Sequence, residues 1–490
     1  MSDPGEWLDF ARKLDWTPSY VDERELYPPE ISGTPWLSQE EWRAWEEPFR
    51  TTYSSYVDGQ HRKELAMQAL SEALGRRNGL LRFDRAWLSA LKLHSALLSL
   101  GEFAAVVGNL GAARFGRDGA WRSTALYGAM DECRHAQIPL RLVHSLVASD
   151  IQFDWTHRLF HTNNWISIAA RHFFDELLLT ANPIELAIGT NFVFETGFTN
   201  LQFVGLAAVA DSVGDHLLER VLTTIQTDEA RHAQIGRAVL EIVARHDKEY
   251  AQRLVDKWWW RSWLLFAVLT GFTMDYLTPL SARSSSFGEF MNEWILTQFD
   301  RTLADCGLER PWYWAEFERT APYYHHMVYA TAYTYRATVW FDLPVPGPDE
   351  RRWLAEKYPS SWAELDPIWE RISERWVEAG AGLDFAVHGT AIVGFCDLCQ
   401  LVLSNGTPKA NSAVTELVGD RKRIFCSEPC RRLFLLERDR YEAHRGLVQR
   451  VLDGAAPGNL VAMLTQYFGL KYEDWGKDAK GGVYPWMDKK

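Results

Sequence analysis

The chain has 490 residues, with 52 Lys and Arg against 65 Asp and Glu, so its formal net charge is −13. This acidic balance disfavours a nucleic-acid-binding protein, because such proteins present a basic surface to the phosphates. Hydrophobic residues make up 47% and charged residues 24% of the chain, which excludes disorder over most of its length. The 23 tryptophans predict a large aromatic core or subunit interface.

Two features bear on the location of the protein. Residues 1–6 are polar and carry no apolar signal segment, so we expect a cytoplasmic protein whose cysteines are reduced. Residues 186–210 are long enough to span a membrane and contain one ionisable residue, Glu195. The scattered Thr, Asn and Gln residues favour a helix buried inside a large protein instead, and we expect no membrane association. An acid in such a helix needs a partner, and a metal ion is one way to supply it.

Four regions follow one another along the chain. Residues 1–80 are rich in Trp, Pro and charge, which predicts short helices and extended arms that contact other subunits. Residues 81–250 show long helical patterns with a turn at 211–215, and residues 251–380 continue them after the bundle, with a Pro-rich break at 343–348. Residues 381–490 contain four of the six cysteines and predict a separate module after a linker at 378–382.

One polar pattern occurs twice in the second region. Asp131-Glu132-Cys133-Arg134-His135 follows Glu102, and Asp228-Glu229-Ala230-Arg231-His232 follows Glu195. The two separations between glutamates, 30 and 34 residues, suit one helix, a turn and an antiparallel return. A Glu and a His three residues apart share a helix face, so they can bind one ion together. In the second copy they lie in one stripe with Leu218, Leu222, Ile225, Gly236 and Val239, which directs them toward the core.

Chance and a purely structural role are the two competing explanations of this repeated pattern. A lone Glu-x-x-His is expected about once by chance in such a chain, but two copies of Asp-Glu-x-Arg-His are not. A buried ion-pair network could use the same residues, but it must also explain Glu102 and Glu195 in apolar helices. Four carboxylates and two imidazoles suit two iron or manganese ions, and helix bundles hold such pairs with one Glu from each of two helices and Glu-x-x-His from each of two others.

The neighbours of the paired glutamates have candidate supporting roles. Asp131 and Asp228 could accept the second ring N–H of a ligand histidine and fix its tautomer. Arg134 and Arg231 would offset the acidic excess of the site.

The sequence resembles a known family through nearly its whole length. The most specific blocks are Phe194-Glu195-Thr196-Gly197-Phe198-Thr199-Asn200 and Gln226-Thr227-Asp228-Glu229-Ala230-Arg231-His232-Ala233-Gln234. Further blocks lie at 15–21, 47–49, 267–271, 274–276 and 357–359. They resemble the hydroxylase α subunit of bacterial multicomponent di-iron monooxygenases, closest to the toluene and alkene (isoprene) branch. The resemblance implies a ferritin-like helix bundle that activates O2 and inserts one oxygen atom into a small hydrocarbon.

The resemblance also implies roles for individual residues. One iron would be bound by Glu102, Glu132 and His135, and the other by Glu195, Glu229 and His232. Thr199 matches the active-site threonine of the family, and Asn200 and Gln226 match polar residues that respond to an effector protein. The implied substrate pocket consists of Leu98, Gly101, Ala105, Phe174, Phe194 and Phe203; each of these would otherwise be read as an ordinary core residue. The substrate could be an alkene or an arene.

The resemblance implies partners as well. The sequence contains no Gly-x-Gly-x-x-Gly or Walker A motif, so we expect no flavin or nicotinamide bound by this chain. Electrons from NAD(P)H would arrive through a separate reductase and a Rieske-type ferredoxin. An effector protein and β and γ hydroxylase subunits would complete an (αβγ)2 assembly.

The C-terminal cysteines form a second motif. Cys396 and Cys399 form a Cys-x2-Cys pair, and Cys426 and Cys430 form a Cys-x3-Cys pair. Four thiolates at this spacing suit one tetrahedral structural zinc ion in a small α+β module. An iron–sulfur or other redox site is the alternative.

Other functions remain open at this level. The same scaffold serves radical-generating reductase subunits and fatty-acyl desaturases, and a non-catalytic assembly or iron-storage subunit could share the fold. The family-specific blocks speak against the first two. The complete ligand set, Thr199 and the apolar pocket speak against the third.

Overall fold

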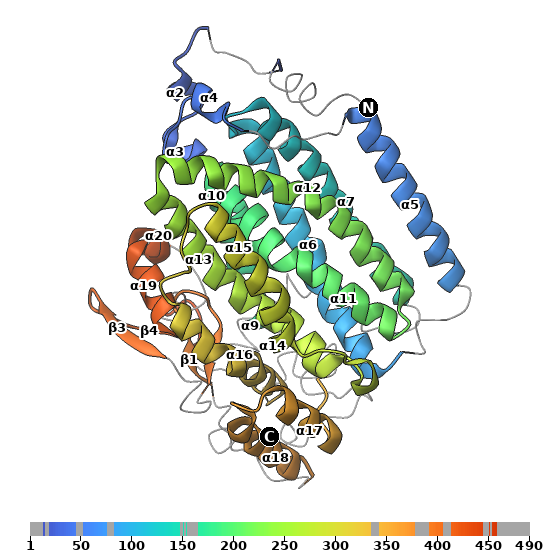
Figure 1. The fold of residues 1–490 in the computed structure, drawn as a ribbon. Coiled ribbons are helices and arrows are strands. Elements are labelled where there is room, and N and C mark those ends of the chain that lie inside the picture. Colours follow the sequence, from blue (N-terminus) through green and yellow to red (C-terminus); the bar gives the residue numbers. More distant parts are fainter. Residues whose placement is uncertain are drawn as a thin grey trace.

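The computed structural model describes residues 13–14, 19–45, 52–75, 83–147, 150, 153, 165–334, 343–377, 392–404, 413–443, 450 and 453–457. Within them the protein is mainly helical, with a small C-terminal module of strands and helices (Figure 1), which confirms the predicted class. The predicted linker at 378–382 and the sequence block at 47–49 lie outside the described residues, as do positions 15–18 of the first block.

The N-terminal region contains three short helices and one long one. α2 (Glu23–Leu26), α3 (Pro29–Ser32) and α4 (Gln39–Trp42) have four residues each, as the sequence predicts. α5 (Tyr53–Gly75) has 23 residues and packs along α12, so the expectation of short helices and arms is wrong for this segment. Its apolar periodicity is weak because its inward side chains include Gln60 and Lys63, which contact carboxylates of the bundle.

Four long helical segments form the central bundle. They are α6 (Arg85–Phe115), α7 (Gly119–Leu146), the π-helix η3 (Ala187–Thr199) continued by α11 (Asn200–Ser212), and α12 (His216–His246). The predicted turn at 211–215 is present. Asp215 caps α12 by accepting a hydrogen bond from Leu218 N at 3.0 Å, and it also accepts one from Trp87 Nε1 at 2.9 Å. This residue therefore ties the start of α12 to the start of α6.

A glycine sets the distance between α12 and η3. A Cβ atom on Gly236 would lie 2.3 Å from the backbone N of Phe192 and 2.5 Å from the backbone C of Asn191. Only a residue without a side chain permits this approach. The glycine follows His232 by one helical turn, so the close contact brings η3 against the part of α12 that carries the second polar pattern.

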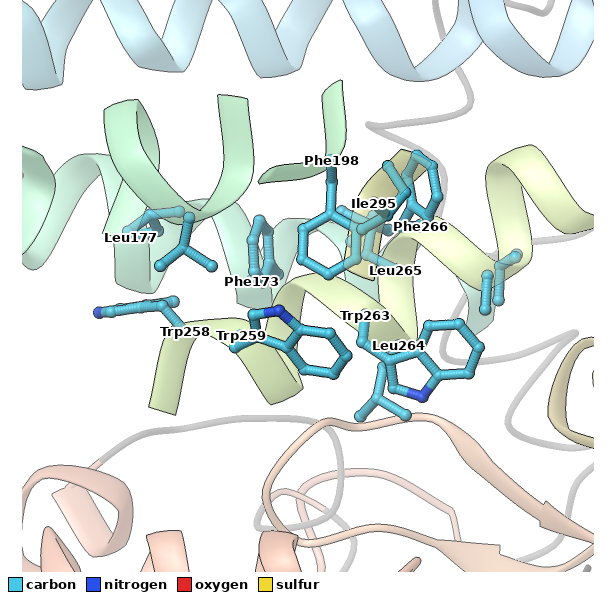
Figure 2. Packing of buried hydrophobic residues seen from close by; sticks show 14 of the residues in the cluster. Phe173, Leu177, Phe198, Trp258, Trp259, Trp263, Leu264, Leu265, Phe266 and Ile295 are labelled. Carbon is cyan, nitrogen blue, oxygen red and sulfur yellow. The ribbon is translucent and has the colours of Figure 1, made fainter. Parts of the chain in front are cut away.

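Further helices pack on the bundle and on one another. They are α9 (Trp165–Phe174), η2 (Asp175–Thr180), α10 (Pro183–Leu186), α13 (Lys248–Phe266), η4 (Ala267–Gly271), η5 (Thr273–Leu277), η6 (Leu280–Ala282), α14 (Phe287–Phe290), η7 (Met291–Leu296), α15 (Thr297–Asp305), α16 (Trp314–Thr334), α17 (Pro348–Lys357) and α18 (Trp362–Val377). Figure 2 shows Trp258, Trp259 and Trp263 of α13 among the buried side chains of the hydrophobic core. Trp259 lies 5.4 Å from Phe198 of η3 between ring centroids. The predicted aromatic core is confirmed, and it joins α13 to the bundle.

The C-terminal module consists of two small antiparallel sheets and two helices. β1 (Ile392–Phe395) pairs with β2 (Val402–Ser404), and β3 (Val414–Val418) pairs with β4 (Arg421–Phe425) in the register Val414 to Phe425. α19 (Glu428–Leu436) and α20 (Arg438–Ala443) follow. The module packs beside α10 and α13 (Figure 1).

Two helices in the described residues are long and apolar enough to cross a membrane, judged by length and composition. They are α6 and the continuous run Pro183–Ser212, and a third candidate is the pair Lys248–Leu277 and Leu280–Asp305, which bends by 107°. In this fold α6 and Pro183–Ser212 are bundle helices, and each carries a glutamate, Glu102 or Glu195, toward Glu132 and Glu229. Their apolar character fits packing inside the bundle.

Candidate active site

The two copies of the polar pattern meet in the middle of the bundle. Glu102 comes from α6, Glu132 and His135 from α7, Glu195 from η3, and Glu229 and His232 from α12. These six residues form two overlapping groups in which ligand atoms lie within 4.8 Å of one another. One group contains Glu102, Glu132, His135 and Glu229, and the other contains Glu132, Glu195, Glu229 and His232.

Glu132 and Glu229 belong to both groups because each places one oxygen beside each histidine. Glu132 Oε2 lies 3.2 Å from His135 Nδ1, and Glu132 Oε1 lies 3.2 Å from His232 Nδ1. Glu229 Oε1 lies 3.0 Å from His135 Nδ1, and Glu229 Oε2 lies 3.0 Å from His232 Nδ1. This is the placement expected of carboxylates that bridge two ions. The sequence pairs each glutamate with the histidine on its own helix, and the sharing is visible only in the structure.

The Glu and His side chains of both groups are suited to bind cations. His232 Nδ1 faces carboxylate oxygens of three residues, with Glu195 Oε1 the farthest at 3.8 Å. One ring nitrogen carries at most one proton, so it cannot donate to all three. Buried carboxylates at this density need compensating positive charge, and carboxylate with imidazole suits iron or manganese.

The pKa values of the Glu and His residues reflect the close packing of these carboxylates. Burial, together with the carboxylates of Glu132 and Glu229, raises the Glu102 pKa well above its ordinary value. Burial, with the Glu229 carboxylate, raises the Glu195 pKa to about 7. Burial opposes protonation of His135, but the neighbouring carboxylates outweigh it and raise the His135 pKa well above its usual range. The site without a cation therefore retains protons that a metal ion would displace.

The aspartates that precede the paired glutamates support the histidine of the opposite helix. Asp228 of α12 lies 3.3 Å from His135 Nε2 of α7, measured to its Oδ2 atom. Asp131 of α7 lies 3.4 Å from His232 Nε2 of α12. Arg231 donates to both aspartates, at 2.7 Å to Asp131 Oδ2 and at 2.6 Å to Asp228 Oδ1. This crossed arrangement locks α7 to α12, and sequence spacing alone could not reveal it.

Helix α5 supplies further contacts to these aspartates, which the sequence did not predict. Gln60 Nε2 donates to Asp131 Oδ1 at 2.8 Å and to Asp228 Oδ1 at 2.9 Å, and its Oε1 accepts from Arg134 Nε at 3.1 Å. Two further contacts come from the same face, since Tyr56 donates to Asp131 and Lys63 pairs with Asp228. Positions 56, 60 and 63 recur at helical spacing, and this feature of the sequence could have predicted that their side chains share one helix face.

An apolar cavity opens beside Glu102 and Glu195. The space inside it that is open to the centre of a water molecule is about 60 Å³. Its lining contains the six residues predicted for a substrate pocket, Leu98, Gly101, Ala105, Phe174, Phe194 and Phe203. It also contains His94, Thr190 and Gln202, which the sequence analysis did not assign. Burial lowers the His94 pKa to about 4, so this ring is neutral, and its Nε2 lies 2.8 Å from Thr273 Oγ1.

Of the remaining predicted residues, Thr199 lies beside Glu195 in the cavity lining. Thr199 lines the cavity, and its hydroxyl donates to the backbone oxygen of Phe194 at 3.0 Å. Asn191 Nδ2 donates to Glu195 Oε2 at 2.7 Å, which holds the carboxylate in place. Gln226 is half-buried on α12 and does not appear in the cavity lining. Asn200 begins α11, and its side chain is outside the described residues.

The four C-terminal cysteines converge as the spacing predicts. Their Sγ atoms all lie within 4.8 Å of one another, with Cys426 and Cys430 3.3 Å apart and Cys399 and Cys426 3.9 Å apart. Thiolates around zinc lie about 3.8 Å apart, since each Zn–S bond is about 2.3 Å long and the angles are tetrahedral. Trp260 Nε1 donates to Cys430 Sγ at 3.3 Å, which connects this site to α13.

Comparison with known proteins gives one consistent family. Residues 16–247 match the family described as Methane/Phenol/Alkene Hydroxylase. The chain is 36% identical to the oxygenase component subunit alpha of the alkene monooxygenase system of Xanthobacter autotrophicus, over 96% of this chain and 95% of that protein. It is 28% identical to the oxygenase component of phenol 2-monooxygenase from Pseudomonas sp. strain CF600, over 94% and 89% of the two chains.

A solved structure supports the same assignment. Phenol hydroxylase from Pseudomonas sp. OX1 superposes with a TM-score of 0.81 at 25% sequence identity and covers 96% of each chain. A non-catalytic assembly subunit and a radical-generating reductase subunit are not favoured, because the relatives are oxygenase components. The chain belongs to the methane/phenol/alkene hydroxylase family and is the hydroxylase α subunit of a multicomponent monooxygenase, an oxidoreductase.

Proposed function

We propose that this α subunit inserts one oxygen atom of O2 into a small hydrocarbon at a di-iron centre. The six ligands are Glu102, Glu132, His135, Glu195, Glu229 and His232. One observation carries the proposal: Glu132 and Glu229 each reach both histidines, directly beside an apolar cavity. Bound iron would supply the redox chemistry that activates O2, and these six side chains would hold it.

The surrounding residues hold the centre and its substrate. Asn191 orients the Glu195 carboxylate through their 2.7 Å hydrogen bond. Asp228 lies 3.3 Å from His135 Nε2 and Asp131 lies 3.4 Å from His232 Nε2, so each aspartate would help to orient the ring of a ligand histidine. The apolar side chains of the cavity bind a hydrocarbon and exclude water. Thr199 can hold or pass a proton at its Oγ1 atom, because it lines the cavity together with Glu195. Asn200 and Gln226 are proposed to respond to the effector protein.

The proposed substrate is a small alkene, with an arene as the second choice. The alkene monooxygenase subunit shares 36% identity with this chain, against 28% for the phenol 2-monooxygenase component. Both classes are apolar and planar at the reacting carbons, so an apolar cavity can bind either of them.

The proposed assembly follows from the named multicomponent relatives. We propose β and γ subunits in an (αβγ)2 complex, an effector protein, a Rieske-type ferredoxin and an NAD(P)H-dependent reductase, all in the cytoplasm. We also propose four regions: an arm and subunit-contact region at 1–80, the di-iron core at 81–250, a helical region at 251–380 and a zinc module at 381–490.

Reconstitution tests the function. The purified oxygenase component should contain about two irons and one zinc per α chain. It should convert propene or toluene to an oxygenated product when reductase, ferredoxin, effector and NADH are all present. Product should be absent when the reductase is omitted. Two irons per chain with no turnover of any alkene or arene in the complete system would contradict the proposed function.

Substitution of one cysteine tests the zinc site. In Cys396→Ser we expect the zinc content to fall from about one per chain to nearly none, because a structural site needs all four thiolates. The melting temperature should fall, and the iron content should remain at about two per chain. The matched control is Cys306→Ser, which removes a cysteine outside the cluster and should leave zinc unchanged. Unchanged zinc in Cys396→Ser would exclude the assignment.

A further inference from the structure

A buried charge network joins the C-terminal module to the helix η2. Its central residue is Glu176, which is fully buried. Glu176 Oε1 accepts a hydrogen bond from Tyr441 of α20 at 2.6 Å and lies 2.9 Å from Lys257 Nζ. Its Oε2 accepts from Arg261 of α13. Burial opposes ionisation of Glu176, but the nearby cations outweigh it and lower its pKa well below the ordinary value.

Arg440 of α20 binds both η2 and the helix α10 that follows it. Its Nη1 donates to the two carboxylate oxygens of Glu185, each at 3.1 Å, and its Nη2 donates to Thr180 Oγ1 at 3.2 Å. Glu185 in α10 also accepts from Lys257 at 2.9 Å. The module therefore holds η2 and the start of the following helix through charged contacts that are largely buried.

The opposite side of η2 is a wall of the cavity. Phe174, Leu177 and Leu178 lie in and next to η2 and line the cavity. Two glycines of α6 let this wall approach closely. A Cβ on Gly101 would lie 3.2 Å from Phe174 Cζ, and a Cβ on Gly108 would lie 2.8 Å from the backbone oxygen of Leu178. The wall is thus held between α6 on one side and the charge network on the other.

The network continues to the cysteine site through stacked rings. Tyr441 stacks on Phe434 with 5.8 Å between ring centroids, and Phe434 contacts Phe425 at 5.2 Å. Phe425 precedes Cys426 in the chain. The cysteine cluster is therefore linked to the cavity wall by a continuous path of packed, buried side chains.

We infer that the C-terminal module positions the substrate, with Tyr441 and Arg440 as positioning residues that fix the η2 wall of the cavity. This inference rests on the proposed function, since it takes the cavity as the substrate site. Neither residue lines the cavity, so each acts through Glu176 and η2 rather than by contact with substrate.

The variant Tyr441→Phe tests the inference in the complete oxygenase complex. It removes one hydroxyl and keeps the ring stacked on Phe434. With toluene as the probe we expect the ratio of product isomers to change by roughly threefold and KM to rise by roughly threefold, because a small shift of the wall alters orientation and binding. Iron content and kcat should stay within about twofold of the parent protein. Hydrogen exchange of residues 174–180 should be faster, and exchange of α12 should be unchanged.

The matched control is Tyr323→Phe, which removes another buried tyrosine hydroxyl that bonds to Glu364 at 3.3 Å, between α16 and α18. It should leave product ratio, KM and exchange in 174–180 unchanged. Arg440→Met is a second variant and should show the same effects as Tyr441→Phe.

Each outcome decides the inference. An unchanged isomer ratio in both variants would overturn it, as would iron loss, which would mean that the network supports the bundle as a whole. If the parent complex oxidises no hydrocarbon, the proposed function fails, and hydrogen exchange still tests whether the module holds η2. Faster exchange at 174–180 then supports the structural link, and unchanged exchange overturns it.

Discussion

Replacing Glu195 by alanine is expected to abolish hydrocarbon oxidation and to reduce the iron content from about two per α chain to about one or fewer. Glu195 is the proposed η3 ligand in the group that contains His232, and we expect that the other three residues of that group cannot replace its carboxylate. The fold should survive, because the substitution adds no bulk to the bundle, removes one carboxylate from a crowded acidic site and costs one buried hydrogen bond, that from Asn191. Iron analysis, turnover in the reconstituted system and circular dichroism measure the three effects.

The control for this variant is Glu241→Ala on α12. Glu241 pairs with Arg237 at 2.8 Å on the surface, and such exposed pairs contribute only about 0–1 kcal/mol. Iron content and turnover should therefore match the parent protein. Two irons and retained turnover in Glu195→Ala would refute the proposed ligand set, whereas loss of helical signal would show that the carboxylate is needed for folding.

Replacing Gly236 by alanine should have the second largest effect. The new Cβ would lie 2.3 Å from the Phe192 backbone, and backbone cannot move aside as a flexible side chain can. We expect a loss of roughly 3 kcal/mol or more in the free energy of unfolding, at or above the upper end for overpacking. Iron content should fall as well, because η3 carries Glu195 and would be pushed away from α12. Thermal denaturation and iron analysis measure these effects.

A second glycine provides the control, and its replacement by alanine should raise the stability of the protein rather than lower it. Gly111 lies in α6, and among the described residues no atom beyond its own stretch of helix would lie within 4 Å of a Cβ placed there. Gly111→Ala should leave iron unchanged and should stabilise the protein by about 0.5–1 kcal/mol, because alanine has the better helix propensity. If Gly236→Ala were as stable and as rich in iron as the parent, the close contact between α12 and η3 would not matter for the site.

Much of the candidate site could be predicted because its signals are local. Glu132 and His135 lie three residues apart, as do Glu229 and His232, and this spacing puts each pair on one helix face. The cysteine cluster is equally local, since each pair closes within five residues. The cavity residues were predicted from the family resemblance, because any one of them resembles ordinary core.

Other features had no comparable signal. Residues 1–80 were expected to form short helices and arms because they are rich in Trp, Pro and charge. The long helix α5 gave no clear signal, since Gln60 and Lys63 on its inward face are turned toward the aspartates of the bundle. His94 and Thr190 were not assigned because a polar residue in a buried helix has many possible partners. The contact between Tyr441 and Glu176 joins residues that are 265 positions apart.

The sequence by itself determined the helical class, the Glu and His residues that can bind two metal ions and the helix face on which each Glu and His pair lies. It also determined the four cysteines that can bind a third ion. These properties depend on periodicity over a few residues, which the backbone geometry of a helix makes visible. The tertiary structure alone decided that Glu132 and Glu229 serve both histidines, that each aspartate supports the histidine of the other helix, and that the C-terminal module holds a wall of the cavity. Those contacts depend on the distances and angles at which separate helices pack, and side chains from the whole molecule set these values together.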